Sequence, residues 1–289
     1  MLSTENLLAF HCRQLELWPL AAANFKALDG VEIKKMTVSG LKMKVQHNPA
    51  RILSTAAKVD KASLAARPCF LCTKNRPTEQ IAFPVLDERY SVLVNPFPIF
   101  KVHFTIPATD HVEQLISADG ARRFADMFLL AKSLCGLAIF YNGPHCGASA
   151  PDHFHFQAVE AKVVPMFEWI ESQCRLPFKV FTALWTDEHD AVAWFRHVCS
   201  QLASYEENNG EPEPRMNVWC VVREDGSVRV VVIPRRTHRP DFYGSGDNQL
   251  LLSPASVDLA GVVVVPSSAD FHQKLTSNHL EQMLSQVCY

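Results

Sequence analysis

The sequence predicts an α+β fold in which an antiparallel sheet predominates and helices pack against it. Short apolar or alternating runs, typical of strands, recur along the whole chain of 289 residues. Longer stretches with apolar residues at helical spacing lie between them. The segment Glu224-Asp225-Gly226 joins two strand-like runs with a strong hairpin signal, which indicates antiparallel neighbours.

The composition is that of an ordinary globular protein. Hydrophobic residues make up 48% of the chain and charged residues 20%, which is enough apolar material for a sizeable core. The length fits one large domain or two closely packed halves. The formal net charge of -2 lacks the basic excess of a general nucleic-acid binder, so we expect no nucleic-acid partner. An anionic ligand must then be held by a local site.

Neither a targeting segment nor a membrane span is predicted. Residues Met1–Asn6 lack the basic and apolar regions of a signal peptide. The longest apolar run, Leu259–Val265, is far shorter than the roughly 20 residues that span a bilayer. The nine cysteines are mostly scattered singly, as expected of thiols in a reducing compartment. We therefore expect a cytoplasmic protein without a membrane partner.

The first part of the chain predicts helices and strands in alternation. Residues 1 to about 30 predict a helix with an irregular apolar face. Residues 31–45 predict two strands around a Ser39-Gly40 turn, and a loop follows them. Two further strands and a helix with a broad apolar face are predicted at Tyr90–Pro96, His103–Pro107 and Ala121–Leu137.

The remaining elements surround a candidate boundary in the chain. Strands are predicted at Leu137–Tyr141 and His153–Val164, and a helix at Trp185–Tyr205. The acidic stretch Glu206–Pro214 contains Gly and Pro and divides the chain into residues 1–205, with the catalytic motif, and residues 206–289, packed on them. The second part predicts a hairpin of Trp219–Val222 and Val228–Ile233, a buried strand at Val262–Val265 and a terminal helix at Ala269–Val287.

The most informative stretch runs from Asn142 to Gln157. A strand ends there in the loop Asn142-Gly143-Pro144-His145-Cys146-Gly147-Ala148-Ser149, whose glycines leave backbone N–H groups accessible to an anion. A strand then begins with His153-Phe154-His155-Phe156-Gln157. Side chains alternate along a strand, so both histidines and the glutamine point to one face while the phenylalanines face a core. Two imidazoles and a carboxamide therefore lie beside a phosphate-sized loop.

This combination suits nucleotidyl transfer. Neutral imidazole is a good nucleophile toward phosphorus near pH 7. Attack on the α-phosphate of a nucleotide gives a nucleotidyl-histidine, from which a second acceptor removes the nucleotide. Gln157 and Ser149 can donate to phosphate oxygens without competing as bases. The alternatives for a His-x-His pair are a metal site or two histidines without a chemical role.

The motif resembles the active-site strand of the transferase branch of the histidine-triad superfamily. That branch contains galactose-1-phosphate uridylyltransferase, diadenosine tetraphosphate phosphorylase and the plant GDP-L-galactose phosphorylases. The resemblance implies that His155 becomes nucleotidylated, with His153 and Gln157 as the other motif residues. The hydrolase branch carries a third histidine at the place of Gln157. Asp152 departs from the uridylyltransferases, which have Pro directly before the first histidine, and this weakens a specific assignment to uridylyl transfer.

Further segments carry the resemblance over most of the chain. They are Asn95-Pro96-Phe97-Pro98, which resembles the family's phosphate-contacting segment, His103 to His111, and, more weakly, Ile233 to Arg236 and Ser253 to Pro266. The resemblance implies a duplicated, uridylyltransferase-like architecture. Because the chain is long enough for both halves, it implies either a monomer or a homodimer.

Cys69-x-x-Cys72 forms half of a tetrahedral zinc site. His111 and His153 can supply the other half, and His103 is the main rival of His111. The set resembles the structural zinc of bacterial uridylyltransferases, in which the first histidine of the pair is a ligand. Zinc bound in this way would fix the strand that presents His155. The alternatives are two free thiols or a redox pair.

Other polar residues are candidates for phosphate binding. The family uses an arginine at a place comparable to that of Arg51, whose planar guanidinium suits phosphate; a surface arginine is the alternative. Asn95 and Asn142 can donate to phosphate oxygens or serve as turn residues. The basic cluster Arg235, Arg236, His238 and Arg239 predicts either a phosphate site for the acceptor or a solvated loop.

The resulting hypothesis is a nucleotidyltransferase or phosphorylase with a covalent nucleotidyl-His155 intermediate. Its donor is a nucleotide substrate, namely a nucleoside diphosphate sugar or a dinucleoside polyphosphate, and its acceptor is phosphate or a sugar phosphate. The loop nucleotide site comprises Asn142, Gly143, Gly147, Ala148 and Ser149. Two alternatives stay open, a histidine-triad nucleotide hydrolase and a non-catalytic, zinc-stabilised nucleotide-binding module.

Overall fold

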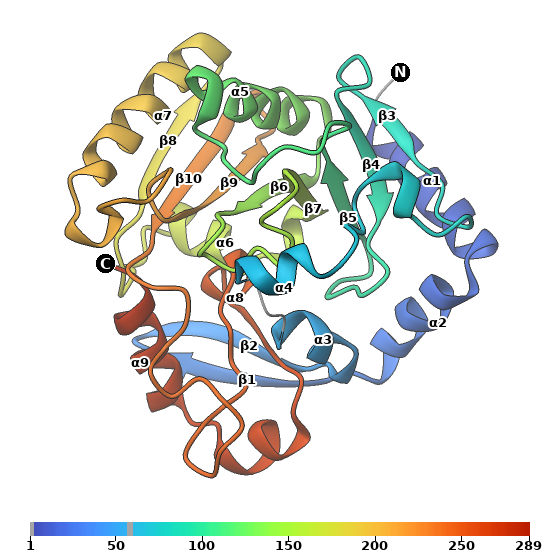
Figure 1. The fold of residues 1–289 in the computed structure, drawn as a ribbon. Helices are drawn as coiled ribbons and strands as arrows, with labels where there is room; N and C mark the ends of the chain where they lie inside the picture. The colour runs from blue at the N-terminus through green and yellow to red at the C-terminus, as the bar shows by residue number, and fades with distance from the viewer. Residues whose placement is uncertain (1–2, 57–59) are drawn as a thin grey trace.

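A computed structural model of the protein describes residues 3–56 and 60–289 (Figure 1). An antiparallel sheet of eight strands forms its centre, and a three-stranded sheet lies below it. The strand order in the large sheet is β3 (Phe83–Val85), β4 (Tyr90–Val94), β5 (His103–Pro107), β7 (His155–Glu160), β6 (Leu137–Asn142), β9 (Met216–Val222), β10 (Val228–Pro234) and β8 (Phe181–Trp185). The small sheet contains β1 (Glu32–Val38), β2 (Leu41–His47) and β11 (Val262–Val265).

Two long helices cover one face of the large sheet. They are α5 (Ala118–Ser133) and α7 (Glu188–Ala203), which lie side by side above the strands (Figure 1). Phe124 of α5 stacks on Phe195 of α7 with ring centroids 4.1 Å apart. Both rings belong to a core that includes Phe154 and Phe156, so the phenylalanines of the central motif face the helices.

The opposite face of the large sheet packs on the small sheet. Phe140 and Trp219 stack there, with ring centroids 4.5 Å apart, and join a second core with Val45 and Val263 of the small sheet. Because side chains alternate along β7, His155 and Gln157 point to this second face. The remaining helices near this side are α3 (Ile52–Thr55), α4 (Lys61–Ala65), α6 (Pro165–Glu171), α8 (Ser256–Leu259) and α9 (Ser277–Val287).

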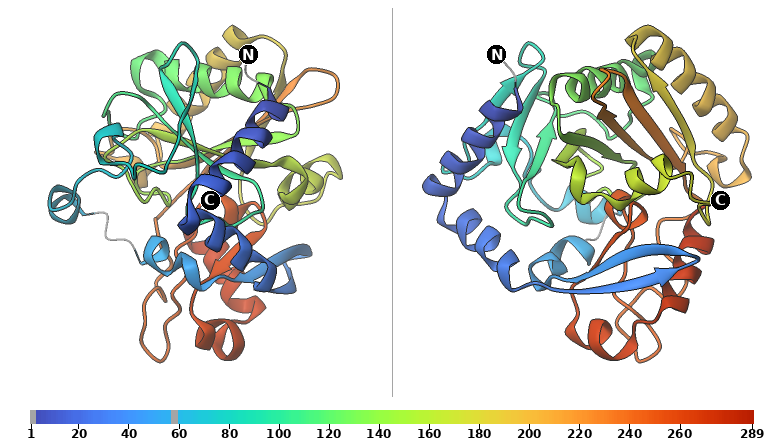
Figure 2. Two further views of the ribbon diagram at one scale, coloured as in Figure 1. Left: turned by 90° about the vertical axis from the view of Figure 1, so that its right-hand side faces the viewer. Right: turned by 180° about the vertical axis from the view of Figure 1, so that it is seen from behind.

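Two N-terminal helices link the two sheets along one edge. Helices α1 (Thr4–Leu17) and α2 (Pro19–Ala27) run from the β3 and β4 end of the large sheet to the small sheet (Figure 1, Figure 2). The single helix predicted for the first 30 residues breaks at Trp18, because Pro19 cannot donate a hydrogen bond to the preceding turn. The predicted terminal helix is also interrupted. A π-helical turn occupies Asp270–Lys274, and Thr276 then caps α9.

The predicted α+β class and the predominance of antiparallel pairing are confirmed. The predicted hairpin is formed by β9 and β10, which pair with each other and with β6 and β8 in the large sheet. The division into residues 1–205 and 206–289 and the duplicated architecture stay predictions. Across the described ranges, 3–56 and 60–289, no helix has the length and apolarity that a membrane span requires.

Candidate functional site

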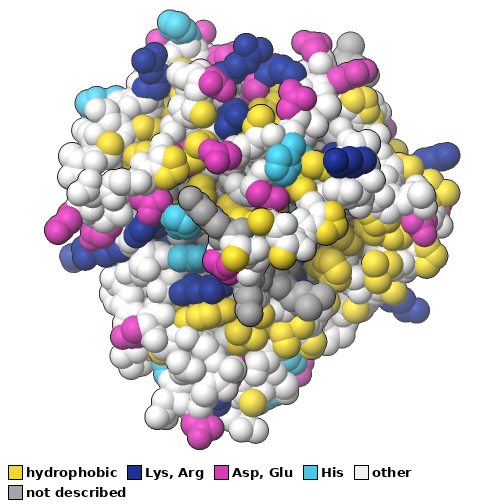
Figure 3. Space-filling view, viewed as in Figure 1, with side chains coloured by type: hydrophobic (Ala, Val, Ile, Leu, Met, Phe, Trp, Pro, Cys, Tyr) yellow, Lys and Arg dark blue, Asp and Glu magenta, His cyan; other side chains and the backbone are white. Residues whose placement is uncertain are grey.

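Two adjoining cavities lie on the second face of the large sheet. The larger has a volume of about 740 Å³ and a mostly apolar wall that includes Trp18, Phe70 and Phe97, and His155 borders it. The smaller holds about 60 Å³ and lies against the segment 253–258. Arg51, Ser149 and Gln157 line both cavities, so a ligand that spans them must pass these three side chains. On the outer face of the molecule seen in Figure 3, apolar side chains gather to the right of the centre.

His155 begins β7 and is almost completely buried. Its Nδ1 lies 2.9 Å from the backbone carbonyl oxygen of His153, which can only accept, so Nδ1 carries the proton and donates it. Burial lowers the pKa of His155 to about 4, which keeps the ring neutral at pH 7. Among the described residues, none contacts Nε2 by a hydrogen bond. The ring therefore presents a free lone pair at the border of the large cavity.

Gln114 holds the backbone of His155 in place. Its side-chain oxygen accepts the N–H of His155 at 2.7 Å, and its amide nitrogen donates to the carbonyl oxygens of His155 at 2.9 Å and Asn142 at 3.0 Å. The side chain of Gln114 is fully buried, so each of these hydrogen bonds is shielded from water. Gln114 thus ties the histidine strand to the end of β6, where the glycine-rich loop begins.

The orientation of the Gln157 amide follows from its neighbour His103. Nδ1 of His103 accepts the backbone N–H of Ile99 at 3.2 Å, so the proton of this neutral ring is on Nε2. Nε2 lies 2.8 Å from Oε1 of Gln157 and therefore donates to it. Burial lowers the pKa of His103 to about 3, which keeps this tautomer neutral. The NH₂ group of Gln157 is then left to donate toward the cavities.

The glycine-rich loop follows β6 and approaches the C-terminal segment closely. Gly147 has φ +99°, and a Cβ there would lie 2.4 Å from Cβ of Ala255, so only glycine fits. Within the described part of the chain, the backbone N–H groups of Gly147, Ala148 and Ser149 donate to no other group. All three residues line the small cavity, which makes this loop a ready anion cradle.

The four other predicted phosphate contacts differ in position. Asn142 lines the small cavity, but its side-chain oxygen accepts from Asn217 and from the N–H of Ser256. Gly143 lies at neither cavity and donates to Met216 at 3.2 Å. Asn95 borders the large cavity and donates to Thr105. Arg51 borders both and donates to the carbonyl of Phe97 at 2.7 Å; burial lowers its pKa to about 10, so it stays cationic.

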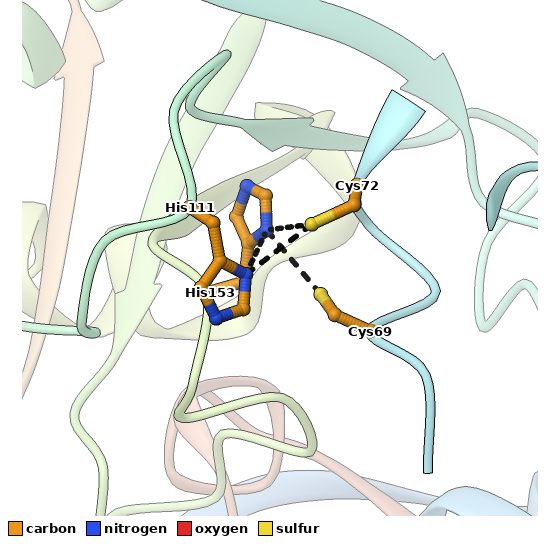
Figure 4. Close-up of side chains that lie close together, drawn as sticks. All are labelled: Cys69, Cys72, His111 and His153. Carbon is orange, nitrogen blue, oxygen red and sulfur yellow. Dashed lines mark hydrogen bonds between the residues drawn. The ribbon is translucent and has the colours of Figure 1, made fainter. Parts of the chain in front are cut away.

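A cluster of four potential metal ligands is formed by Cys69, Cys72, His111 and His153 (Figure 4). Cys69 and Cys72 come from the loop after α4, His111 from the loop after β5, and His153 from the residues just before β7. Their ligand atoms lie within 4.8 Å of one another. Sγ of Cys69 is 3.3 Å from Nδ1 of His153, Sγ of Cys72 is 3.3 Å from Nδ1 of His111, and the two Nδ1 atoms are 3.2 Å apart.

This donor set fits zinc. Bonds of about 2.3 Å to sulfur and about 2.0 Å to nitrogen in a tetrahedron place the ligand atoms roughly 3.3 to 3.8 Å apart. Nε2 of His153 is 2.8 Å from the carbonyl oxygen of Ala108, which fixes the ring and leaves Nδ1 for a metal, as second-shell partners of ligand histidines do. The cluster can therefore bind a metal such as zinc. His103, the rival of His111, instead contacts Gln157.

The structure corrects one part of the motif analysis. His153 precedes β7 and turns its ring to the cysteines, so it does not share a strand face with His155 and Gln157. His153 lies at a bend that follows a turn at Pro151 and Asp152, so the regular alternation of strand side chains begins only after it. The ring of His153 therefore lies at the cluster with Cys69, Cys72 and His111, whereas His155 borders the large cavity.

The basic cluster that follows β10 separates into residues with different surroundings. Arg235 is fully buried and donates to five carbonyl oxygens and Oδ1 of Asn217. Arg236 is exposed and stacks on Tyr289. His238 and Arg239 line the small cavity. Only these last two are therefore placed to meet a ligand.

Two residues of the site, Gln114 and Arg67, were not predicted from the sequence, and a third, His103, was predicted only as a rival metal ligand. Nothing in the sequence indicated the contacts of Gln114 or the contact of His103 with Gln157, because both side chains act through partners far away in the chain. Arg67 borders the large cavity and contacts the carbonyl of Ser149 at 3.4 Å and Asp152 at 3.2 Å. The only sequence feature that links Arg67 to the site is its position two residues before Cys69.

The comparisons with known proteins agree with the fold. No curated protein matches the chain. The solved structure of yeast Ap4A phosphorylase Apa2 is similar over 94% of this chain and 97% of its own, with a TM-score of 0.63 and 17% identity. The structures of that enzyme with AMP and with Ap4A give the same TM-score, at 16% and 18% identity over 95% or more of both chains.

At this identity the likeness shows the fold, and it confirms the predicted resemblance to the transferase branch of the histidine-triad superfamily at that level. A family model described as a domain of unknown function, DUF4922, matches residues 10–160, which contain the cysteine pair and the whole histidine motif. The chain belongs to this DUF4922 family.

Proposed function

We propose that the protein transfers a nucleotide in two steps, through a covalent bond between phosphorus and Nε2 of His155. The observation that carries this proposal is the hydrogen bond from Nδ1 of His155 to the carbonyl oxygen of His153. It fixes the tautomer in which Nε2 holds the free lone pair. Because the ring is neutral and borders the cavity, it needs no separate base to act as a nucleophile.

In the first step, the Nε2 lone pair forms a bond to the α-phosphorus of the donor. The bond from phosphorus to the leaving oxygen breaks, and the leaving phosphate keeps the electron pair. In the second step, an oxygen of the acceptor phosphate forms a bond to the same phosphorus, and the P–N bond returns its electrons to the neutral imidazole. Two inversions give net retention at phosphorus and ping-pong kinetics.

The groups around His155 suit the charge that develops during transfer. The NH₂ group of Gln157 and the N–H groups of Gly147, Ala148 and Ser149 are donors that need no reorganisation. Arg51 adds a positive charge where the two cavities meet. These groups stabilise the phosphoryl oxygens, and none of them competes with His155 as a nucleophile.

The large cavity suits the nucleoside of the donor. Its aromatic wall offers stacking surfaces for a base, and its volume of about 740 Å³ lies in the range of small-molecule sites. The yeast enzyme with the same fold has been solved with AMP and with Ap4A, which supports a nucleotide as ligand. We propose a nucleoside diphosphate sugar or a dinucleoside polyphosphate as donor, and phosphate or a sugar phosphate as acceptor.

Zinc in the Cys69, Cys72, His111 and His153 cluster would act as a structural ion that fixes the residues in front of His155. His153 would then have two tasks. Its ring would hold the metal, and its carbonyl oxygen would hold the His155 tautomer. The cluster would thus orient the nucleophile without touching the substrate.

The proposal is tested by incubating the protein with GDP-, UDP- and ADP-hexoses and with diadenosine tetraphosphate, each with and without phosphate. Release of a nucleoside diphosphate only when phosphate is present supports the transferase. Parallel lines in double-reciprocal plots at several phosphate concentrations support the two-step order. Nucleoside monophosphate released at the same rate without phosphate would contradict the transferase and indicate a hydrolase.

A further inference from the structure

The small cavity is a chamber with an excess of positive charge. Arg51 and Arg239 line it together with a single carboxylate, that of Asp258. Asp258 accepts the N–H groups of Ala255 and Val264, each at 2.9 Å, so both its oxygens are engaged by the backbone. Two guanidinium groups and one carboxylate thus line the chamber among the described residues, and the backbone already engages the carboxylate.

Arg239 is held in a fixed orientation. Its Nε donates to Oγ of Ser253 at 2.9 Å, and its guanidinium carbon lies 4.1 Å above the ring of Tyr243. A guanidinium that is stacked and hydrogen-bonded in this way loses little further conformational entropy when it binds an oxyanion. Its planar geometry also matches a phosphate group better than a lysine ammonium does.

The segment that carries Arg239 is itself anchored. The buried Arg235 donates to the carbonyl oxygens of Thr237, His238 and Pro254, at 3.0 to 3.2 Å. Burial and the nearby Arg239 lower the pKa of His238 to about 3, so its ring is neutral and offers a donor without charge. Arg235 therefore fixes the backbone that forms the wall of the chamber, whereas His238 and Arg239 line the chamber itself.

The size of the chamber limits what it can hold. A water molecule needs about 10–15 Å³ of such space, so about 60 Å³ has room for roughly four to six oxygen-sized groups. That is the content of one tetrahedral oxyanion. An organic part attached to it must lie outside the chamber.

We propose that this chamber binds the phosphate group that accepts the nucleotide, and that Arg239 is its principal recognition residue. The chamber shares Gln157, Ser149 and Arg51 with the cavity that His155 borders, so a phosphate here adjoins the reaction centre. The second step reverses the first at phosphorus, so the first phosphate of the leaving group occupies the same chamber. The acceptor role rests on the proposed function, whereas the binding of phosphate does not.

The test is calorimetric titration of the nucleotide-free protein with inorganic phosphate at constant ionic strength. Arg239→Gln is expected to weaken binding at least tenfold, because a charge-assisted fork is lost. Arg239→Lys, which keeps the charge and loses the fork, is expected to give an intermediate value. Arg236→Gln is the matched control, because Arg236 is exposed and stacks on Tyr289, and it is expected to bind phosphate within twofold of the wild type.

The same variants are titrated with glucose 1-phosphate to distinguish a sugar phosphate from free phosphate. Binding of either ligand that depends on Arg239 but not on Arg236 supports the proposal. The proposal is overturned if a folded Arg239→Gln variant binds phosphate and glucose 1-phosphate as tightly as the wild type does. Phosphate binding that depends on Arg239 in a protein that never forms a nucleotidyl adduct would instead refute the proposed function and leave the chamber as an anion site.

Discussion

Nδ1 of His155 lies 2.9 Å from the backbone carbonyl oxygen of His153, whose own ring points to Cys69, Cys72 and His111. His153 thus connects the cluster of potential metal ligands to the proposed nucleophile, through its own side chain and backbone and one hydrogen bond. A bound metal would restrain the His153 ring and, with it, the carbonyl that selects the tautomer of His155. Under the proposed function, order in the cluster would therefore affect the reactivity of His155.

Cys72→Ser is expected to remove the metal and to slow turnover without changing a group that touches the substrate. A serine oxygen is a poorer ligand for zinc than a thiolate, so three ligands remain and binding weakens at least tenfold. Metal content is measured by inductively coupled plasma mass spectrometry on the purified protein, alongside the unfolding temperature. The wild type is expected to hold one zinc ion per chain.

Cys174→Ser serves as the control for this substitution, because Cys174 is an exposed thiol outside the cluster. Its zinc content and unfolding temperature are expected to match those of the wild type. Equal zinc content in Cys72→Ser and Cys174→Ser would show that the four residues do not form the metal site.

Gln157→Glu is expected to lower kcat by about 100-fold or more, which is typical for the loss of one donor to a developing oxyanion. The variant keeps the oxygen that accepts from His103 but replaces the NH₂ group with a second oxygen, which repels phosphate. Gln201→Glu on the exposed side of α7 makes the same chemical change away from the site. Similar kcat values for the two variants would exclude Gln157 from transition-state stabilisation.

Comparing Gly147→Ala with Gly210→Ala distinguishes the cost of a left-handed backbone from the cost of a steric clash. Both Gly147 (φ +99°) and Gly210 (φ +81°) are left-handed, but a Cβ would meet Ala255 at 2.4 Å in the first and nothing within 4 Å in the second. Gly210→Ala is expected to lower the free energy of unfolding by about 1 kcal/mol. Gly147→Ala is expected to lower it by a further 1–3 kcal/mol or so, as overpacking does. Equal values in urea unfolding would show that the loop does not need this contact.

Glu213 gives the protein a pH-dependent stability. Its oxygens face Ser117 and Tyr141, and the Tyr141 hydroxyl also lies 2.7 Å from the carbonyl of Gln114. Tyr141 has one proton for two acceptors, so the network is complete when Glu213 is protonated and donates to Tyr141. Burial raises the pKa of Glu213 from 4.5 to about 7, in agreement with this arrangement.

Because the folded state binds this proton more tightly than the unfolded state, the contribution of Glu213 to stability is greatest below pH 4.5 and is lost as the pH rises toward 7. The loss is on the order of 3 kcal/mol for a pKa raised by this amount. Glu213→Gln, which donates without ionising, is expected to abolish this part of the pH dependence. The measurement is urea unfolding of both proteins from pH 5 to pH 7.5. A constant difference between the two curves would contradict the assignment.

The sequence was sufficient to predict which four residues form the cluster of potential metal ligands, and His155 as the candidate nucleophile, which lies at the border of the large cavity. Ligand spacing is a local property for Cys69 and Cys72, and the resemblance supplied the histidines. It was not sufficient for the direction of the His153 ring, because His153 lies at a bend before β7 and not in the strand. Gln114 and His103 act through partners 28 to 54 positions away, and such contacts depend on strand order rather than on any local pattern.

In the fold, too, local patterns were predictable and contacts between distant segments were not. The β9–β10 hairpin was predictable because its turn residues are adjacent in the chain. Strand β8 was not, because its exposed, weakly alternating residues become a strand through pairing with β10. Arg235 was predicted as part of a basic cluster, yet it is buried, and it donates to the backbone carbonyls of three distant residues, Cys146, Pro254 and Val287.

The most direct test of the nucleotidyl-His155 intermediate is intact-protein mass spectrometry after mixing with each donor in the absence of acceptor. We predict a mass gain of one nucleoside monophosphate with one donor class, reversed on addition of phosphate. The gain is expected to persist in His145→Ala, whose ring pairs with Glu211 outside both cavities, and to vanish in His155→Ala. An adduct that forms equally in His155→Ala, or turnover that this variant retains in full, would contradict the account.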